Sequence, residues 1–232
     1  MTTVPDRGAM SGITSAASFL TGLIGANIWS AVPYPRPHSS PDRIRAFFRT
    51  DPRPARLSAA GQLVSAVTLG RFTVSAARLA HHTNPMSRRL PAAAVAGGAT
   101  ATASLVASAV YTALLTTDRA DDDETALSMH RRAFLAGGVV HGVGYGLLVG
   151  ALGLAGRRAG VLSPALADVA FASAAAGLLT PLYLVAEPAA WLIPLGRFSG
   201  FLVVGRAAAQ LARRQPVVRG SLAQETAPAV CD

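Results

Sequence analysis

One uncharged stretch, residues 133–156, constrains the fold more than any other part of the chain. Its 24 residues exceed the roughly 20 apolar residues that a helix needs to cross a bilayer. Glycines at every fourth position, Gly138, Gly142, Gly146 and Gly150, line one face of such a helix. Small residues on one face let a neighbouring helix pack closely in lipid. The stretch therefore predicts the central helix of a membrane bundle.

The composition favours an integral membrane protein over a soluble one. Hydrophobic residues make up 51% of the chain and charged residues only 14%, too few charges to coat a soluble globule of this size. The net charge of +9 comes from arginine alone, and the arginines lie at the ends of apolar runs. Membrane lipids with anionic headgroups are therefore the expected partners, and nucleic acid is not. We predict a multi-pass protein of the cell membrane.

Six apolar segments are long enough to form spanning helices, which predicts an all-α, polytopic membrane helix bundle. They form one domain over residues 10–212, after a polar start at 1–9 and before a tail at 213–232 that is expected to be disordered. The expected spans are residues 10–32, 57–80, 90–117, 133–156, 160–186 and 188–212. A signal peptide is the alternative for the first span, but no small-residue cleavage motif follows it.

The second of these segments leaves two topologies open. Arg71 and Arg78 interrupt it seven residues apart and lie on roughly the same helix face. An arginine at the centre of a span costs about 2.5–3.5 kcal/mol on insertion scales. The segment therefore either crosses with Arg71 facing a protein or aqueous interior, or it dips into the membrane and returns. Its length favours six spans, whereas the distribution of arginines favours five.

The proline-rich connection after the first span contains a short amphipathic helix. Ile44, Phe47 and Phe48 share one side of it, and three arginines can reach outward. This pattern predicts a helix in the headgroup layer with its apolar side against lipid, although contact with a partner protein is also open. The acidic residues at 118–124 lack the glycine and ligand spacing of a calcium loop, so we interpret them as a solvated charge run.

A set of ionisable residues lies within the later apolar segments, and such residues usually face a bundle interior and pair with one another. Together with Arg71 the set is His141, Asp168, Glu187 and Arg197. One hypothesis is that an acid pairs with an arginine beside His141 and lines a polar cavity. The alternative is that the acids lie near helix ends, the arginines extend to the interface, and His141 hydrogen-bonds a neighbouring helix.

The motifs of familiar enzymes are missing from the sequence. It contains no phosphate-binding loop with lysine, no paired-histidine zinc motif, no nucleophile elbow and no CxxC pair. Cys231 is the single cysteine, so no internal disulfide is possible, and we predict no metal and no cofactor. The expected function is that of a non-enzymatic structural, accessory or regulatory protein that binds lipid, another membrane protein or itself. A small transporter or channel is the alternative.

The order of segments resembles a family of small, uncharacterised six-helix bacterial (actinobacterial) membrane proteins. The resemblance rests on the first span, the short amphipathic helix, and the run HRRAFLAGGVVHGVGYGLLVGALGLAGRRAGVLSP at residues 130–164, in which a glycine-rich helix, a basic turn and a small-residue helix follow one another. It implies six helices and carries no function. Arg197 matches none of the family's motifs.

Overall fold

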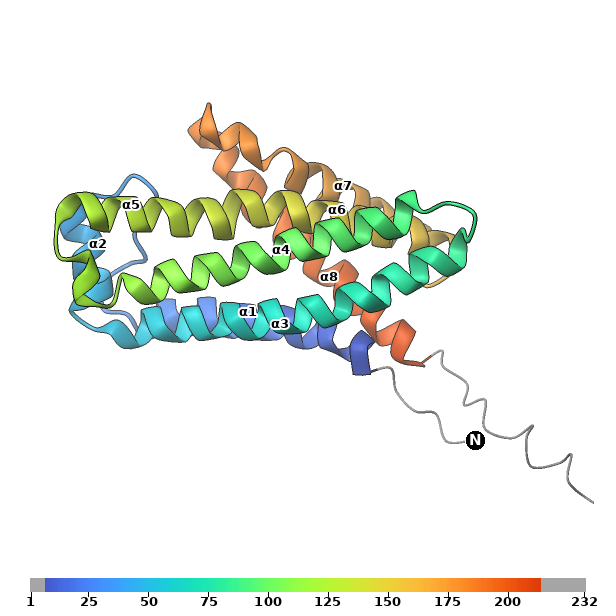
Figure 1. The fold of residues 1–232 in the computed structure, drawn as a ribbon, viewed down its shortest axis with the longest axis horizontal. Coiled ribbons are helices and arrows are strands. Elements are labelled where there is room, and N and C mark those ends of the chain that lie inside the picture. The colour runs from blue at the N-terminus through green and yellow to red at the C-terminus, as the bar shows by residue number, and fades with distance from the viewer. Residues whose placement is uncertain (1–6, 214–232) are drawn as a thin grey trace, which may run out of the picture.

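The structure is a computed structural model that describes residues 7–213. Within that range the chain is all-α, and six helical segments are long and apolar enough to cross a membrane. The candidate spans are Gly8–Trp29, Pro52–Thr83, Arg89–Leu114, Asp123–Arg158, Pro164–Leu184 and Glu187–Arg213. The chain is thus an integral membrane protein built as a helix bundle (Figure 1). The predictions for residues 1–6 and for the tail from 214 onward lie outside the described residues.

The spans are built from α-helices and short distorted segments. The α-helices are α1 (Arg7–Trp29), α2 (Pro41–Arg49), α3 (Pro52–Thr83), α4 (Arg89–Leu114), α5 (Asp123–Phe134), α6 (His141–Arg158), α7 (Pro164–Leu178) and α8 (Leu192–Arg213). The distorted segments are η1 (Asp118–Ala120), η2 (Leu135–Val140), η3 (Thr180–Leu184) and η4 (Glu187–Trp191), of which η2 is a π-helix and the others are 3₁₀.

Local signals explain where the helices begin and end. Asp51 and Asp122 precede α3 and α5 and accept hydrogen bonds from the backbone N–H groups of Arg53 and Thr125, at 3.1 and 2.7 Å. The bonds from Thr125 also lower the pKa of Asp122. Gly160 follows α6 with φ of 63°, a conformation that ends helices and favours glycine. Pro194 lies in the first turn of α8, which begins at Leu192, and proline is tolerated there.

The second apolar segment is a single helix in the structure. α3 runs without a break for 32 residues, about 48 Å at 1.5 Å per residue, beside α1 and α4. A segment that dips in and returns would need a turn near its middle, and α3 has none. The expectation that six spans require a buried Arg71 is corrected as well, because Arg71 is exposed on the outer face of α3.

The row of four glycines faces α7 and the segments that follow it. An added Cβ on Gly146 would lie 2.9 Å from the Ala174 carbonyl oxygen, and one on Gly150 would lie 3.1 Å from the Cβ of the same residue. Gly142 faces Thr180 of η3, and Gly138 faces Ile193 of α8. A side chain at Gly146 would therefore force α6 and α7 apart.

A second glycine contact joins α6 to α4 on another side of the helix. A Cβ on Gly144 would lie 2.6 Å from the backbone nitrogen of Ala101, and one on Gly97 would lie 2.6 Å from the Gly144 oxygen. α6 is consequently packed closely on both sides, by α4 and by α7. It lies at the centre of the bundle, and its own Leu148 and Leu152 belong to the large apolar core cluster.

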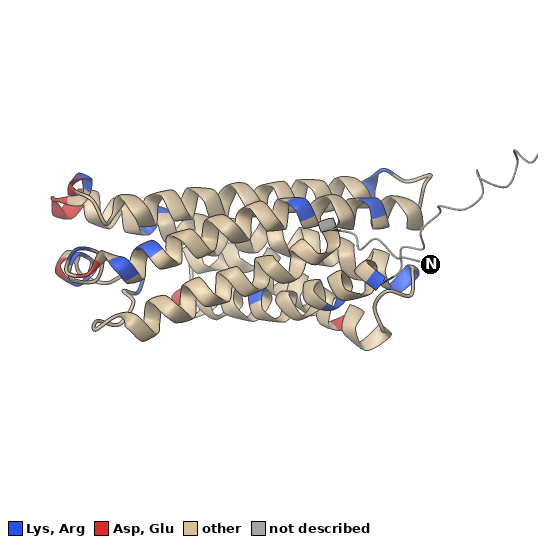
Figure 2. Cartoon of the chain, turned by 90° about the horizontal axis from the view of Figure 1, so that it is seen from below, with Lys and Arg blue, Asp and Glu red and all other residues tan. Residues whose placement is uncertain are grey.

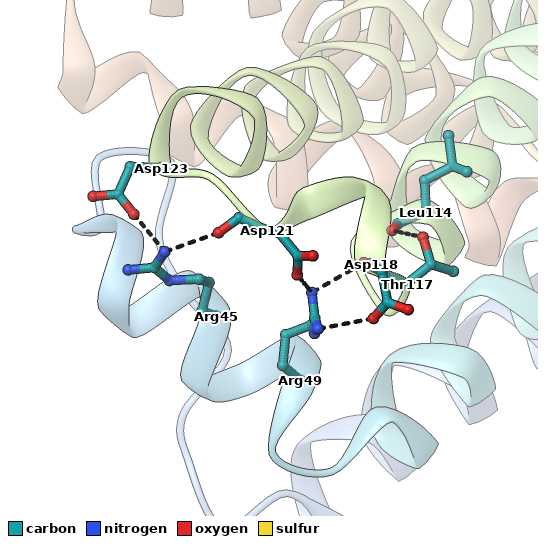
Figure 3. A network of polar contacts seen from close by, with 7 residues as sticks. All are labelled: Arg45, Arg49, Leu114, Thr117, Asp118, Asp121 and Asp123. Atoms are coloured by element: carbon teal, nitrogen blue, oxygen red, sulfur yellow. Dashed lines mark hydrogen bonds and ion pairs between the residues drawn. The ribbon is translucent and has the colours of Figure 1, made fainter.

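Charges are concentrated at the two ends of the bundle, and acids and arginines lie together at the end that holds α2 (Figure 2). Arg49 of α2 donates to Asp121 at 2.5 Å and to Asp118 at 3.0 Å, and Arg45 donates to Asp123 at 2.6 Å (Figure 3). We call these contacts the α2 clasp. The acidic run is solvent-exposed, in keeping with its interpretation as a solvated charge run, and three of its aspartates also pair with arginines of α2.

Contact between the apolar side of α2 and lipid is also corrected. Ile44, Phe47 and Phe48 are at most 2% exposed and pack against Leu115, Ala120 and Ala126 of the acidic connection and α5. Tyr34, in the connection before α2, meets Phe47 with ring centroids 4.9 Å apart. The helix is amphipathic as predicted, but its apolar face is covered by the acidic connection and α5, and the α2 clasp adds ion pairs to the same connection.

Candidate functional site

The structure contains a cavity of about 200 Å³, bordered at one end by Tyr34, which packs against Phe47 of α2. Helices α1, α3, α4, α5 and α8 and the π-helix η2 enclose it. Its walls are mostly apolar, and its polar lining residues are Tyr34, Ser58, Gln62, Ser108, His130 and Arg197. Gln62 lies ten residues after the start of α3, about 15 Å along the helix at 1.5 Å per residue. On α1 the lining residue Phe19 lies at the middle of the helix, so the cavity extends from the α2 end toward the middle of the bundle.

Arg197 supplies the positive charge of this cavity. Its Nη2 donates to the Gly137 carbonyl oxygen of η2, and its guanidinium carbon lies 4.7 Å from the centre of the Phe19 ring. Its Nε is buried without a hydrogen-bond partner, and none of the ion pairs among residues 7–213 includes Arg197. A contact with a carbonyl and an aromatic face stabilises a cation without neutralising it. The cavity therefore holds a net positive charge.

The carbonyl that Arg197 contacts lies within the π-helix η2. In an α-helix each carbonyl oxygen accepts a bond from the residue four positions on, whereas the wider π turn disturbs this pattern over Leu135–Val140. Glycines at 137 and 138 leave that surface open, and a Cβ on Gly137 would collide with the Ser108 hydroxyl. The glycines thus allow both the close approach of α4 and the contact with Arg197.

His130 and Gln62 place two further polar groups at the cavity. His130 is 2% exposed, and its Nε2 lies 3.1 Å from the Arg36 carbonyl oxygen, while its Nδ1 has no partner among the described residues. Gln62 donates from Nε2 to Ser58 at 3.4 Å, and its Oε1 is likewise buried without a partner. Buried polar atoms in native structures nearly always have partners. His130 Nδ1, Gln62 Oε1 and Arg197 Nε are three such unpartnered atoms around one cavity. Together they indicate a place for a polar ligand.

Tyr34 closes the cavity on the side of α2. It lies in the connection between α1 and α2, between the aromatic pair of α2 and His130, whose ring centroid is 6.5 Å away. Burial raises the pKa of Tyr34 to about 12, so its hydroxyl stays protonated in the neutral range. The α2 clasp, which fixes α2, therefore also fixes one wall of the cavity.

The predicted polar cluster forms only in part. His141 is buried, hydrogen-bonds the Ala101 carbonyl oxygen at 3.1 Å, and stacks on Tyr145 with ring centroids 5.3 Å apart. Arg197 lies close enough to both rings to interact electrostatically with them. The structure thus brings Arg197 and His141 near each other, as the hypothesis required, although His141 and Tyr145 do not line the cavity.

The remaining three residues of the predicted cluster lie elsewhere, which corrects the proposed acid and arginine pairing. Asp168 is exposed in the second turn of α7 and lies 3.6 Å from Arg157. Glu187 is exposed at the start of η4, and Arg71 is exposed on α3. No acid therefore reaches Arg197 within residues 7–213.

Reasoning from the sequence missed His130 and Gln62. Gln62 carried a usable signal, because it is a polar amide within an apolar segment. His130 carried none, since it stands beside two arginines before the glycine-rich stretch and reads as interfacial. For metal binding, the described residues contain no group of three or more His, Cys, Asp or Glu side chains that could hold an ion.

Comparisons of the chain with protein-family models, with curated proteins and with solved structures found no match. The resemblance to a six-helix bacterial family stays a prediction, and the function is argued below from the cavity.

Proposed function

We propose that this chain is a non-enzymatic accessory protein of the cell membrane that binds the phosphate of a lipid headgroup in the cavity below α2. The observation that carries the proposal is the buried guanidinium of Arg197, which borders a cavity and has no carboxylate partner in the described chain. Burying an unpaired charge is costly, so an anion that enters the cavity gains a strong attraction.

The size and position of the cavity favour a headgroup over a whole lipid. Pockets for drug-sized ligands have volumes of about 300–1,000 Å³, and this one has about 200 Å³. Its outer end lies beside Tyr34 and α2, at one end of the bundle, and it extends inward to Phe19 at the middle of α1. Apolar walls made by Phe19, Leu23 and Ile193 suit the first carbons of the acyl chains.

The proposal is tested by lipid binding to the full chain in detergent. Dioctanoyl phosphatidylglycerol is compared with dioctanoylglycerol, which lacks the phosphate, by native mass spectrometry. We expect the phospholipid to bind more tightly and Arg197→Gln to weaken its binding at least tenfold, since losing one partner of a buried charged contact is costly. Arg71→Gln removes an exposed arginine on α3 and should leave binding unchanged. Equal binding of the phospholipid to wild type and Arg197→Gln would overturn the proposal.

Transport of the bound lipid is the second candidate function. The closeness of Arg197 to His141 and Tyr145 favours it, because polar groups continue from the cavity toward the middle of the bundle. The packed cluster of Phe72, Leu148 and Leu152 opposes it, because these buried side chains fill the next part of the core. Movement of a fluorescent phospholipid between leaflets of proteoliposomes would separate the two functions, and we expect the rate of protein-free vesicles.

A further inference from the structure

The hydrogen-bonding state of His130 is determined by its neighbour. Its Nε2 lies 3.1 Å from the carbonyl oxygen of Arg36, and a carbonyl oxygen can only accept. Nε2 therefore carries the hydrogen. In the neutral ring the other nitrogen, Nδ1, is then a bare acceptor. A charged ring would place a second cation beside Arg197 in a cavity where the described chain supplies no carboxylate, so the neutral ring is the favoured form.

The acceptor Nδ1 is buried and unused. It has no hydrogen-bond partner among the described residues, and the His130 side chain lines the same cavity as Arg197. Gln62 adds a second unused acceptor, its Oε1, from the facing helix α3. The cavity thus offers one cationic donor and two acceptors, and a phosphodiester monoanion, whose phosphate carries no hydrogen, would by itself satisfy only the donor.

We infer that the headgroup bound in this cavity joins its phosphate to a hydrogen-bond donor, an N–H or O–H group, that His130 Nδ1 accepts. The inference rests on the proposed function and deepens it. Phosphoethanolamine is the simplest headgroup of this kind, because its phosphate meets Arg197 while its ammonium donates to His130. Phosphocholine has the same phosphate but three methyl groups in place of the N–H hydrogens, so it leaves Nδ1 without a partner.

The test is a methylation series on the ligand with the unaltered full chain. Short-chain phosphatidylethanolamine, its N-methyl and N,N-dimethyl forms and phosphatidylcholine are titrated in detergent, and their dissociation constants are measured. Each methyl group adds similar bulk, but only the last one removes the final N–H bond. We expect the main loss of affinity, about five- to tenfold, at that last step, since one hydrogen bond is at stake. An even decline across the series, or no decline, would overturn the inference.

A variant links the effect to His130. His130→Phe keeps an aromatic ring and removes the acceptor, so it should abolish the difference in affinity between the dimethyl form and phosphatidylcholine. Retained discrimination in a folded His130→Phe protein would contradict the assignment. If this variant fails to fold, the methylation series on the wild type decides the matter alone.

Two further experiments test whether the headgroup must come from a lipid and distinguish the inference from the proposed function. Free phosphoethanolamine and free phosphocholine are tested as competitors; stronger competition by the former supports the donor requirement and shows that a water-soluble ligand can meet it. Phosphatidylglycerol carries hydroxyl donors and should bind like phosphatidylethanolamine. Equal binding across all phospholipids that still depends on Arg197 would leave the proposed function standing and refute the donor requirement. Binding that ignores Arg197 would refute the proposed function itself.

Discussion

At the scale of single residues, the bundle depends on where a side chain is missing as much as on where one is present. Gly144 and Gly97 let the backbones of α6 and α4 touch, and Gly146 and Gly177 do the same for α6 and α7. Arg197 shows the opposite case, because its long side chain reaches a backbone carbonyl within the π-helix. Both effects come from backbone atoms that neighbouring helices can approach.

Two glycine variants separate close packing from helix propensity. In Gly144→Ala the new Cβ would lie 2.6 Å from the Ala101 nitrogen, so the helices must shift, and we expect a loss of about 1–3 kcal/mol in the free energy of unfolding. Gly205→Ala places a methyl group where no atom lies within 4 Å, and alanine should stabilise α8 by about 0.5–1 kcal/mol. Thermal unfolding in detergent measures both. Equal midpoints for the two variants would contradict the packing of α4 on α6.

At the scale of elements, α2 shows how two kinds of contact hold a short helix in place. Its apolar face is buried against the acidic connection and α5, and burying each of Ile44, Phe47 and Phe48 contributes about 1.5–3 kcal/mol. Arg45 and Arg49, one turn apart, reach the aspartates of the same connection (Figure 3). The apolar contacts supply most of the stability, because half-exposed ion pairs are individually weak.

Loosening the α2 clasp should affect α2 locally. Arg49→Gln removes the contacts with Asp118 and Asp121, and we expect the backbone amides of α2 to exchange with deuterium about two- to fivefold faster. Added salt should reduce the difference from wild type, since it screens the same ion pairs.

Arg43→Gln is the matched control for this change. Arg43 is an exposed arginine of the same helix that takes part in none of the ion pairs of the described chain. An equal increase in exchange for Arg43→Gln and Arg49→Gln would mean that the α2 clasp does not hold α2.

At the scale of the whole molecule, six spans place both ends of the bundle domain on the same side. The start of α1 and the end of α8 lie at the end opposite to α2 (Figure 1). The connection between α3 and α4 lies at that same end, while α2 and the acidic connection share the other. This arrangement makes the topology measurable with a few labelled positions.

Single cysteines should report two sides. In a Cys231→Ser background, we expect Ser40→Cys and Thr117→Cys to react with a membrane-impermeant maleimide from one side of sealed vesicles, and Ser87→Cys from the other. The expectation follows from α3, which separates Ser40 from Ser87 by one uninterrupted helix. Labelling of Ser40→Cys and Ser87→Cys from the same side would mean that α3 does not cross and that five spans are correct.

The sequence by itself determined the all-α bundle and its six apolar helices, because the length of an uncharged segment and the residues at its ends are local properties. It could not determine which ionisable residues face inward. Arg71 and Arg197 both interrupt apolar segments, yet one is exposed and the other borders the cavity. That difference depends on which helix packs against which face, and so does the burial of Phe47 and Phe48.

Only the tertiary structure decided the candidate site. Gln62, His130 and Arg197 come from three helices, and their distances along the chain carry no sign of a shared cavity. The glycine row indicated that α6 would be closely packed, but not that a π-helix before it would offer a carbonyl to Arg197. The physical reason is that hydrophobic length places a helix in the membrane, whereas contacts between helices determine which polar atoms are left for a ligand.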